Sequence, residues 1–285
     1  MSTIADLIST LQYRLDTMAD LVHLFNQAIR MVAKRLYTME SSIIVSGFDT
    51  DLYAAVTYAS AGNIAFVDGG GSADTITDSS NGFSTAGFHA TMYINTDQAS
   101  NHGPFKITTV AAGTLTMPTA TLVAAGGASG ITITSIPNYF DLPTGFWGLK
   151  GSPWLSGKYN VLEPLPDRET ALSLQVAGVP EYYEIKGSRM YTYPSPASDV
   201  VLNGDYFVRP TAITATTDTV PFNEIFDDAI CEVTMLLYDA NQTNQVTNYK
   251  LAEEIIKSYV ELIAPKWDRK SATDFQDAVQ WDALI

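Results

Sequence analysis

The 285-residue sequence has one cysteine, Cys231, and three histidines. A single cysteine excludes a disulfide within one chain and a zinc site built from several cysteines. His23, His89 and His102 fall in a predicted helix, a predicted strand and a predicted turn, and none has a second histidine at metal-ligand spacing. The motifs of zinc proteases, serine hydrolases and phosphate-binding loops are also missing. The sequence therefore predicts no metal, no cofactor and no enzymatic activity.

Basic side chains are scarce, because 16 Lys and Arg stand against 31 Asp and Glu, for a formal net charge of −15. A surface this acidic repels phosphate backbones, so we expect no tight nucleic-acid binding, although like charge suits a channel through which DNA slides. Arg30 and Lys34 are four residues apart on a predicted helix and share one face, with Arg35 beside them. This face is either solvated or a docking patch for an acidic partner, such as another copy of the chain.

Long apolar runs are also missing. No stretch approaches the roughly 18 uninterrupted apolar residues of a membrane span. The first residues lack the basic and apolar regions of a signal peptide, so we expect neither feature. Apolar residues make up 46% of the chain and charged residues only 16%, which is typical of a folded protein with one large or two ordinary domains.

Helical periodicity is present at both ends of the sequence. Apolar residues three and four apart predict helix from residue 3 to about 38, and near Asp16 one kinked helix and two helices are both open. Two long helices are predicted near the C-terminus, at about 222–240 and 245–264, the second ending before a proline. A short helix is predicted at 167–178.

The sequence between these helical regions is typical of strands. From about residue 41 to 136, short segments rich in Thr, Val and Ile are bounded by Gly, Asn, Asp or Ser, which indicates an all-β sandwich or barrel. We interpret residues 60–137 as an inserted β-domain. Its glycine-rich stretch carries Asp68, Asp74 and Asp78 but lacks the repeat and loop spacing of calcium sites, so we interpret it as a turn between strands.

The stretch "PEYYEIKGSRMYTYPSP", residues 180–196, contains two alternating runs around a Lys-Gly-Ser-Arg centre. This pattern predicts a β-hairpin whose turn is made by Gly187 and Ser188. Lys186 and Arg189 flank the turn, where charged side chains are usually solvated. The residues alone leave open whether the two cations mark a site.

The order of these elements resembles the head-to-tail adaptor (connector) proteins of tailed bacteriophages, over residues 1–45 and 139–265. In that family a "P-x-x-Y-x-I-x-G-x-x-(I/M)-x-x-x-P-x-P" hairpin precedes a "Y-x-(F/V/L)-x-(Y/R)-x-P" strand. These places are filled here by Pro180, Tyr183, Ile185, Gly187, Met190, Pro194, Pro196, Tyr206, Val208 and Pro210.

The predicted β-domain is similar to a small β-module found in phage virion proteins. In that module an "N-x-G-x-F-x-I" turn and strand precede a "T-L-T" strand. Asn101, Gly103, Phe105 and Ile107 match the first motif, and residues 114–116 match the second. The similarity implies that His102 lies in a turn between strands and has a structural role.

The resemblance implies an α+β fold class. A helical adaptor core, made of an N-terminal helix pair and two long C-terminal helices, would carry a small antiparallel β-unit and an inserted all-β, sandwich- or barrel-like domain. The expected divisions are 1–59 for the N-terminal helices and first strands, 60–137 for the β-domain, 138–265 for the rest of the core, and 266–285 for an extended docking tail.

The resemblance also implies a function. Such an adaptor is a structural virion protein of the phage neck, assembled in the bacterial cytoplasm as a ring of twelve copies. The ring joins the portal protein to the tail and continues the DNA channel for genome retention and ejection. Its expected partners are the portal protein, its own copies and downstream tail or nozzle proteins, with no membrane and no specific DNA contact.

Two sets of residues are expected to make these contacts. Aromatic and aliphatic anchors of the tail are expected to dock on the portal or on a neighbouring copy: Trp267, Phe275, Val279 and Trp281. Cations are expected to contact neighbouring subunits: Arg30, Lys34, Arg35, Lys186 and Arg189. The alternatives are a tail-associated receptor- or carbohydrate-binding virion protein, which leaves the helices unexplained, and an acidic hydrolase, whose catalytic residues we do not find.

Overall fold

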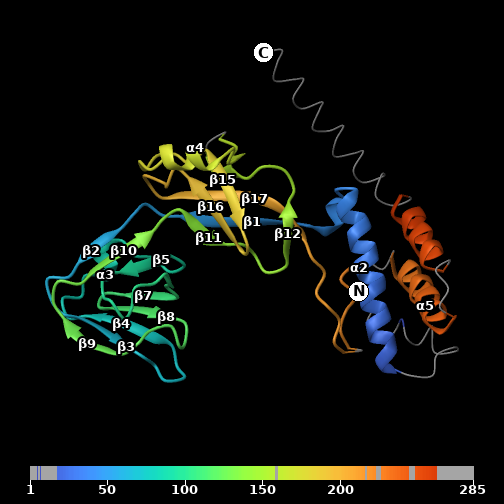
Figure 1. Ribbon diagram of the computed structural model, residues 1–285, viewed down its shortest axis with the longest axis horizontal. Helices are drawn as coiled ribbons and strands as arrows, with labels where there is room; N and C mark the ends of the chain where they lie inside the picture. Colours follow the sequence, from blue (N-terminus) through green and yellow to red (C-terminus); the bar gives the residue numbers. More distant parts are fainter. Residues whose placement is uncertain are drawn as a thin grey trace, which may run out of the picture. The chain divides into compact units, whose positions relative to one another are not determined.

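The computed structural model forms two compact units, which are described separately. The helical unit comprises residues 1–47, 144–150 and 205–285, and the strand unit comprises residues 48–143 and 151–204. Figure 1 shows the elements of both units along the chain. The residues that the structure describes are 5, 7, 18–157, 160–215, 217–222, 226–243 and 248–261.

Helix α2, Met18–Thr38, is the longest described helix of the helical unit. Its apolar residues recur every three or four positions, which places them on one face. Phe25, Val32 and Leu36 have no exposed surface, so this face forms the centre of the core. Residues 5 and 7 are also helical, and the junction near Asp16 lies outside the described residues.

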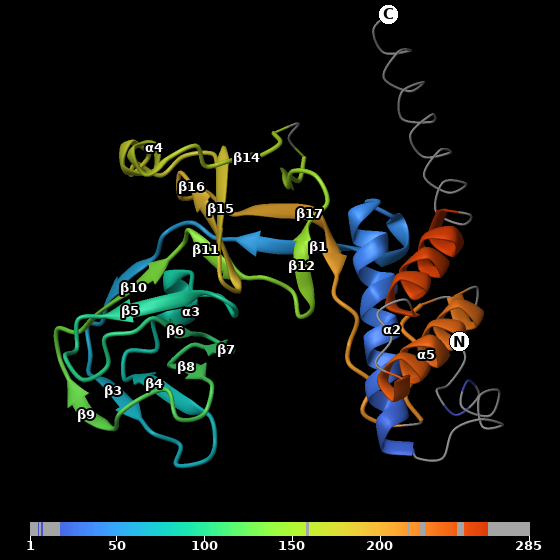
Figure 2. The same cartoon turned by 45° about the vertical axis from the view of Figure 1, so that its right-hand side comes forward.

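Helix α5, Asp227–Thr243, lies beside α2 in both ribbon views (Figures 1 and 2). Asp227 and Asp228 occupy its first turn, where carboxylates are favoured by the positive end of the helix dipole. Residues 248–261 are helical as well. Both segments contribute buried side chains to the core around α2: Ile230, Val233, Leu237, Ala252, Ile256 and Val260.

A four-stranded sheet follows α2 and the short 3-10 helix η1, Ser42–Ile44. Its order is β1-β17-β12, with β13 also paired to β17. Within the helical unit the Tyr37 ring stacks on Trp147 at 4.7 Å and meets Phe207 edge-on at 4.8 Å. The strands are β1 (Val45–Leu52), β12 (Phe146–Leu149), β13 (Trp154–Leu155) and β17 (Val200–Val208).

Two sheets of the strand unit share one hydrophobic core, which includes Phe66, Ile76, Ile94 and Leu115. One sheet has five strands in the order β7-β8-β4-β3-β9, and the other has four in the order β2-β10-β5-β6. A short helix, α3 (Phe83–Ala86), lies between β4 and β5 in sequence. The strands are β2 (Thr57–Ala59), β3 (Ile64–Val67), β4 (Asp74–Asp78), β5 (Tyr93–Thr96), β6 (Phe105–Lys106), β7 (Thr109–Ala111), β8 (Thr114–Met117), β9 (Ala125–Ala128) and β10 (Thr132–Ile136).

The fourth sheet, in the order β11-β16-β15-β14, contains the predicted hairpin. Lys186 pairs with Arg189, which leaves Gly187 and Ser188 as the turn, so this prediction is confirmed. Gly187 has a φ of +62°, a value that glycine adopts at little cost. The elements are β11 (Tyr139–Asp141), β14 (Glu163–Pro164), β15 (Tyr182–Lys186) and β16 (Arg189–Tyr193), with the short helix α4 (Arg168–Ser173) between β14 and β15 in sequence.

The expected fold class, a helical adaptor core with two long C-terminal helices, is wrong. In the described part of the chain, seventeen strands in four sheets make up most of the regular structure. The long helical segments among the described residues are few: α2 has 21 residues, α5 has 17, and residues 248–261 form the last one. We expected only first strands before residue 60 and a small β-unit after residue 137, but β1, β2 and β11 to β17 lie there, so the predicted helical core is itself rich in strands. The four-part domain division stays a prediction.

Candidate functional site

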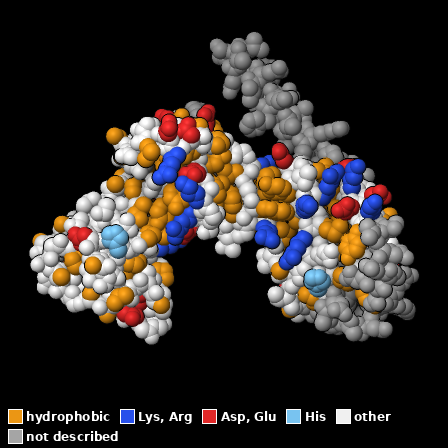
Figure 3. Space-filling view, in the orientation of Figure 1, with side chains coloured by type: hydrophobic (Ala, Val, Ile, Leu, Met, Phe, Trp, Pro, Cys, Tyr) orange, Lys and Arg blue, Asp and Glu red, His pale blue; other side chains and the backbone are white. Residues whose placement is uncertain are grey.

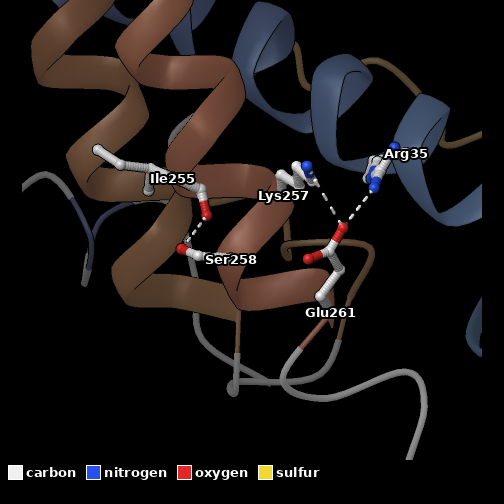
Figure 4. Close-up of polar contacts among 5 residues, drawn as sticks. All are labelled: Arg35, Ile255, Lys257, Ser258 and Glu261. Carbon is white, nitrogen blue, oxygen red and sulfur yellow. Dashed lines mark hydrogen bonds and ion pairs between the residues drawn. The ribbon is translucent and has the colours of Figure 1, made fainter.

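The cations predicted on α2 lie at the surface of the helical unit. Arg30 and Lys34 are exposed, and Arg35 is partly buried. The Nη2 atom of Arg35 donates to Oε1 of Glu261 at 2.7 Å, and Nζ of Lys257 lies 4.0 Å from the same oxygen (Figure 4). The Nε of Arg35 is buried and has no hydrogen-bond partner among the described residues. Arg35 therefore has one hydrogen-bond donor that no described residue satisfies.

Lys34 and Arg35 belong to a larger feature, which we call the basic groove. It is a cavity of about 550 Å³ between α2 and the helical segment 248–261. Its basic side chains are Lys34, Arg35, Lys250 and Lys257, and its apolar lining is Met31 and Ile256. Two carboxylates, Glu253 and Glu254, also line it, so the lining carries four positive and two negative charges.

The net charge of the groove lining is thus +2, in a chain whose formal net charge is −15. Figure 3 shows Lys and Arg side chains gathered on one face of the helical unit, with hydrophobic side chains between them. A concave surface with a local positive potential and an apolar lining is suited to a ligand that is both acidic and apolar.

Lys186 is exposed at the end of the hairpin. Its Nζ pairs with Oε2 of Glu184 at 2.7 Å and lies 5.3 Å from the centre of the Tyr191 ring. The hydrogen bond to the Glu184 carboxylate raises the pKa of Lys186, which therefore stays charged. Its position is suited to a surface contact.

Arg189 lies in what we call the arginine–tyrosine cluster, inside the strand unit. Its guanidinium carbon is 5.0 Å from the ring centres of both Tyr93 and Tyr139, and its Nε is 3.5 Å from Oδ1 of Asp141. The other Asp141 oxygen, Oδ2, accepts from Nζ of Lys106 and from the Tyr93 hydroxyl, both at 2.5 Å. Arg189 thus joins strands β5, β11 and β16 of its own chain.

The electrostatics of the arginine–tyrosine cluster follow from its burial and its charges. Burial, together with the neighbouring Asp141 carboxylate, raises the pKa of the Tyr93 hydroxyl. Burial alone would raise the pKa of Asp141, but hydrogen bonds from Lys106 and Tyr93 outweigh it and lower that pKa. The adjoining cavity of about 120 Å³ is smaller than the roughly 300 Å³ of small-molecule sites. The cluster therefore has the character of a structural contact.

Cys231 is buried, as predicted, and burial followed by nearby carboxylates raises the pKa of its thiol to about 11. A thiol that stays protonated at neutral pH is a poor nucleophile. The described residues contain no group of three or more His, Cys, Asp or Glu able to hold a metal. Among the same residues, no helix is long and apolar enough to cross a lipid bilayer.

The aspartates of the glycine-rich stretch stabilise turns. Asp74 accepts backbone hydrogen bonds from Gly69 and Leu122, at 2.8 and 2.7 Å. The side chain of Asn101 exchanges two hydrogen bonds with the backbone of Val123, both at 2.8 Å. The predicted turns at these positions are confirmed.

The predicted tail anchors lie outside the described residues: Trp267, Phe275, Val279 and Trp281. The sequence singled out five cations, and the structure brings two of them, Lys34 and Arg35, into the basic groove. It adds Lys250 and Lys257, which we did not single out. Their seven-residue spacing on a helix, which places them on one face, was the available signal.

A search of curated proteins finds no match to this chain. The family model described as SU10 adaptor protein matches residues 106–273, which is more than half of the chain. The matched region begins at β6, within the predicted β-domain, and continues through the hairpin, β17, α5 and the helical segment 248–261. The chain therefore belongs to the SU10 adaptor protein family.

Proposed function

We propose that this chain is a structural adaptor of a phage virion, and that twelve copies form a ring between the portal protein and the tail. The observation that carries the proposal is the family match over residues 106–273. The order of hairpin, strand and helices, on which the resemblance to head-to-tail adaptors rests, lies within this region. Membership in a family of structural adaptors supports a role without catalysis.

A closed ring requires one face of each copy to contact a different face of the next copy. Because every copy carries a net charge of −15, the copies repel one another unless local charges are complementary. Arg30, Lys34 and Arg35 supply a positive face that an acidic surface of a neighbour can approach. This complementarity supports the proposed inter-subunit contact.

The hairpin cations are proposed to contribute differently. Lys186 is exposed and able to reach a neighbouring subunit directly. Arg189 is already held by two tyrosine rings and Asp141, so its contribution would be to fix the strands that present such a contact. Neither residue is proposed as a catalyst.

The acidic excess also supports passage of DNA. Like charge keeps a duplex from adsorbing to a channel wall, so the ring would continue the portal channel for genome retention and ejection without binding DNA specifically. Downstream tail or nozzle proteins would bind the opposite side of the ring. Assembly would take place in the bacterial cytoplasm and end in the neck of the virion.

Electron microscopy of the purified full-length chain mixed with portal protein tests the proposal. We expect twelve-fold rings on one face of the portal. A virion map that places the chain away from the neck would overturn the proposal. Binding of the full chain to glycans without binding to portal would instead support the receptor- or carbohydrate-binding alternative.

A further inference from the structure

The basic groove has a chemical character that sets requirements on a ligand. Four cations gather at a cavity of about 550 Å³ that also has an apolar lining, on a chain of net charge −15. Its Arg35 retains a buried Nε with no described hydrogen-bond partner. A peptide that combines carboxylates with large apolar side chains would satisfy both the charge and the apolar lining.

One segment of the chain itself has this composition. Residues 271–285 contain three aspartates, Asp274, Asp277 and Asp282, and no Lys, Arg or His. The same fifteen residues include Phe275, Val279, Trp281, Leu284 and Ile285. The segment lies outside the described residues.

We propose that the basic groove of one copy binds the C-terminal segment 271–285 of a neighbouring copy. The inference rests on the proposed function, because it requires copies to be neighbours in a ring. Aspartates of the segment would face Lys34, Lys250 and Lys257, and its aromatic and aliphatic side chains would cover Met31 and Ile256.

Nine residues connect the C-terminal segment to the helical segment that forms one wall of the groove. The described helical segment ends at Glu261, and the nine residues 262–270 span up to about 30 Å when extended. A segment bound in the groove of its own chain would neutralise that groove but leave nothing to hold two copies together. Exchange between copies places opposite charges at every interface of a closed ring, which offsets the repulsion between chains of net charge −15.

Carbodiimide cross-linking of the assembled full-length protein tests the exchange, because the reagent joins a lysine amine to a carboxylate in direct contact. Copies with natural nitrogen are mixed with ¹⁵N-labelled copies before assembly. We expect cross-links from Lys34, Lys250 or Lys257 to Asp274, Asp277 or Asp282, in peptide pairs that carry one labelled and one unlabelled partner. Pairs with matching labels only, which indicate docking within one chain, would overturn the proposal, as would no such cross-links.

A charge-reversal pair tests the chemistry of the groove. We expect Lys250→Glu/Lys257→Glu to reduce the mixed-label cross-links from Lys34 at least about tenfold, because like charges then face the segment. The matched control is Arg168→Glu/Arg209→Glu, which changes the net charge equally at two exposed positions outside the groove. If the control reduces these cross-links as strongly, net charge accounts for the loss and the groove does not.

A compensating pair of substitutions tests whether misfolding explains the loss in the groove-reversed protein. Asp277→Lys/Asp282→Lys in the segment should restore mixed-label cross-links to the groove-reversed protein, now between the introduced lysines and glutamates, because the charges are then exchanged across the same contact. No recovery would count against the proposal. If wild-type rings form on the portal without these cross-links, only this inference fails. If no rings form, the proposed function fails.

Discussion

At the scale of single residues, Asp78 shows how this chain uses a buried carboxylate. It lies at the end of β4 and is 3% exposed. It accepts hydrogen bonds from the hydroxyls of Tyr58 and Ser60 at 2.6 and 2.5 Å, and from the backbone of Ser80 and Gly82 at 3.0 and 2.9 Å. Burial alone would raise the pKa of Asp78, but these hydrogen bonds outweigh burial and hold that pKa well below its usual value.

Because the pKa of Asp78 is lower in the folded than in the unfolded chain, its ionised form stabilises the fold. This stabilisation is fully present above the unfolded pKa of about 4 and is lost as the pH falls through the lower folded pKa. We expect Asp78→Asn to lower the free energy of unfolding of the strand unit by about 1–3 kcal/mol at pH 7. The loss should shrink below about pH 4, where the unfolded carboxyl is already protonated.

Urea unfolding of wild type and variant at pH 7 and at about pH 3.5 measures this difference. Asp68→Asn is the matched control, because Asp68 is exposed in the same glycine-rich stretch and accepts one hydrogen bond, from the backbone of Gly70. An unchanged difference between wild type and Asp78→Asn at the two pH values would show that ionisation of Asp78 does not stabilise the fold.

The sequence predicts the turn that these aspartates occupy but does not predict the hydrogen-bond partners of Asp78. The absence of calcium-loop spacing was sufficient to predict that the glycine-rich stretch is a turn. The partners of Asp78 include Tyr58 and Ser60, which belong to a different part of the chain, and no local pattern indicates which hydroxyl meets which carboxylate.

At the scale of elements, the arginine–tyrosine cluster joins three strands that are distant in sequence. Arg189 on β16 packs on Tyr93 of β5 and Tyr139 of β11. We expect Arg189→Ala to reduce the stability of the strand unit by about 1–2 kcal/mol, because each partly exposed cation–π contact contributes about 0.5–1 kcal/mol. Arg189→Lys should recover only part of this loss, since an ammonium group does not stack as a planar guanidinium does.

Chemical denaturation of the purified variants measures these changes. The control is Lys186→Ala at the adjacent end of the same hairpin, where the lysine is 57% exposed and we expect a change within about 0.5 kcal/mol. If Arg189→Ala and Lys186→Ala have equal effects, the cluster does not hold the strands together.

The same elements show which features of the fold a local sequence pattern predicts. The hairpin was predictable because Gly187 and Ser188 carry its turn signal within a few residues. The pairing of β16 with β11, and of β14 with β15 in parallel, depends on contacts that the sequence does not order. The helical periodicity of α2 is long and strong, whereas strands such as β13 and β14 have only two residues each. Sequence periodicity therefore overstates the helical share of this fold.

At the scale of the whole molecule, folding depends on the apolar cores, whereas association between copies depends on surface charge. The two described cores use apolar residues up to Val260, and we expect folding not to require residues 266–285. The net charge of −15 makes association between copies dependent on local exceptions, of which the basic groove is one. Folding and assembly are thus expected to respond to different substitutions.

Deletion of residues 266–285 tests this separation. The deletion removes the predicted anchors Trp267, Phe275, Val279 and Trp281 and leaves both described cores whole. We expect the free energy of unfolding to change by less than about 0.5 kcal/mol, because no buried side chain of those cores is lost. Attachment to the portal should be abolished, because the deletion removes the anchors of the proposed contact between copies, on which the ring that binds the portal depends.

Denaturation and co-sedimentation with portal protein measure the two effects on the same preparation. A full-length variant with the four anchors replaced by serine keeps the length of the tail, and it should lose attachment as the deletion does. If only the deletion loses attachment, chain length accounts for the contact and the anchors do not. If the truncated chain attaches as well as the full chain, docking takes place elsewhere on the adaptor.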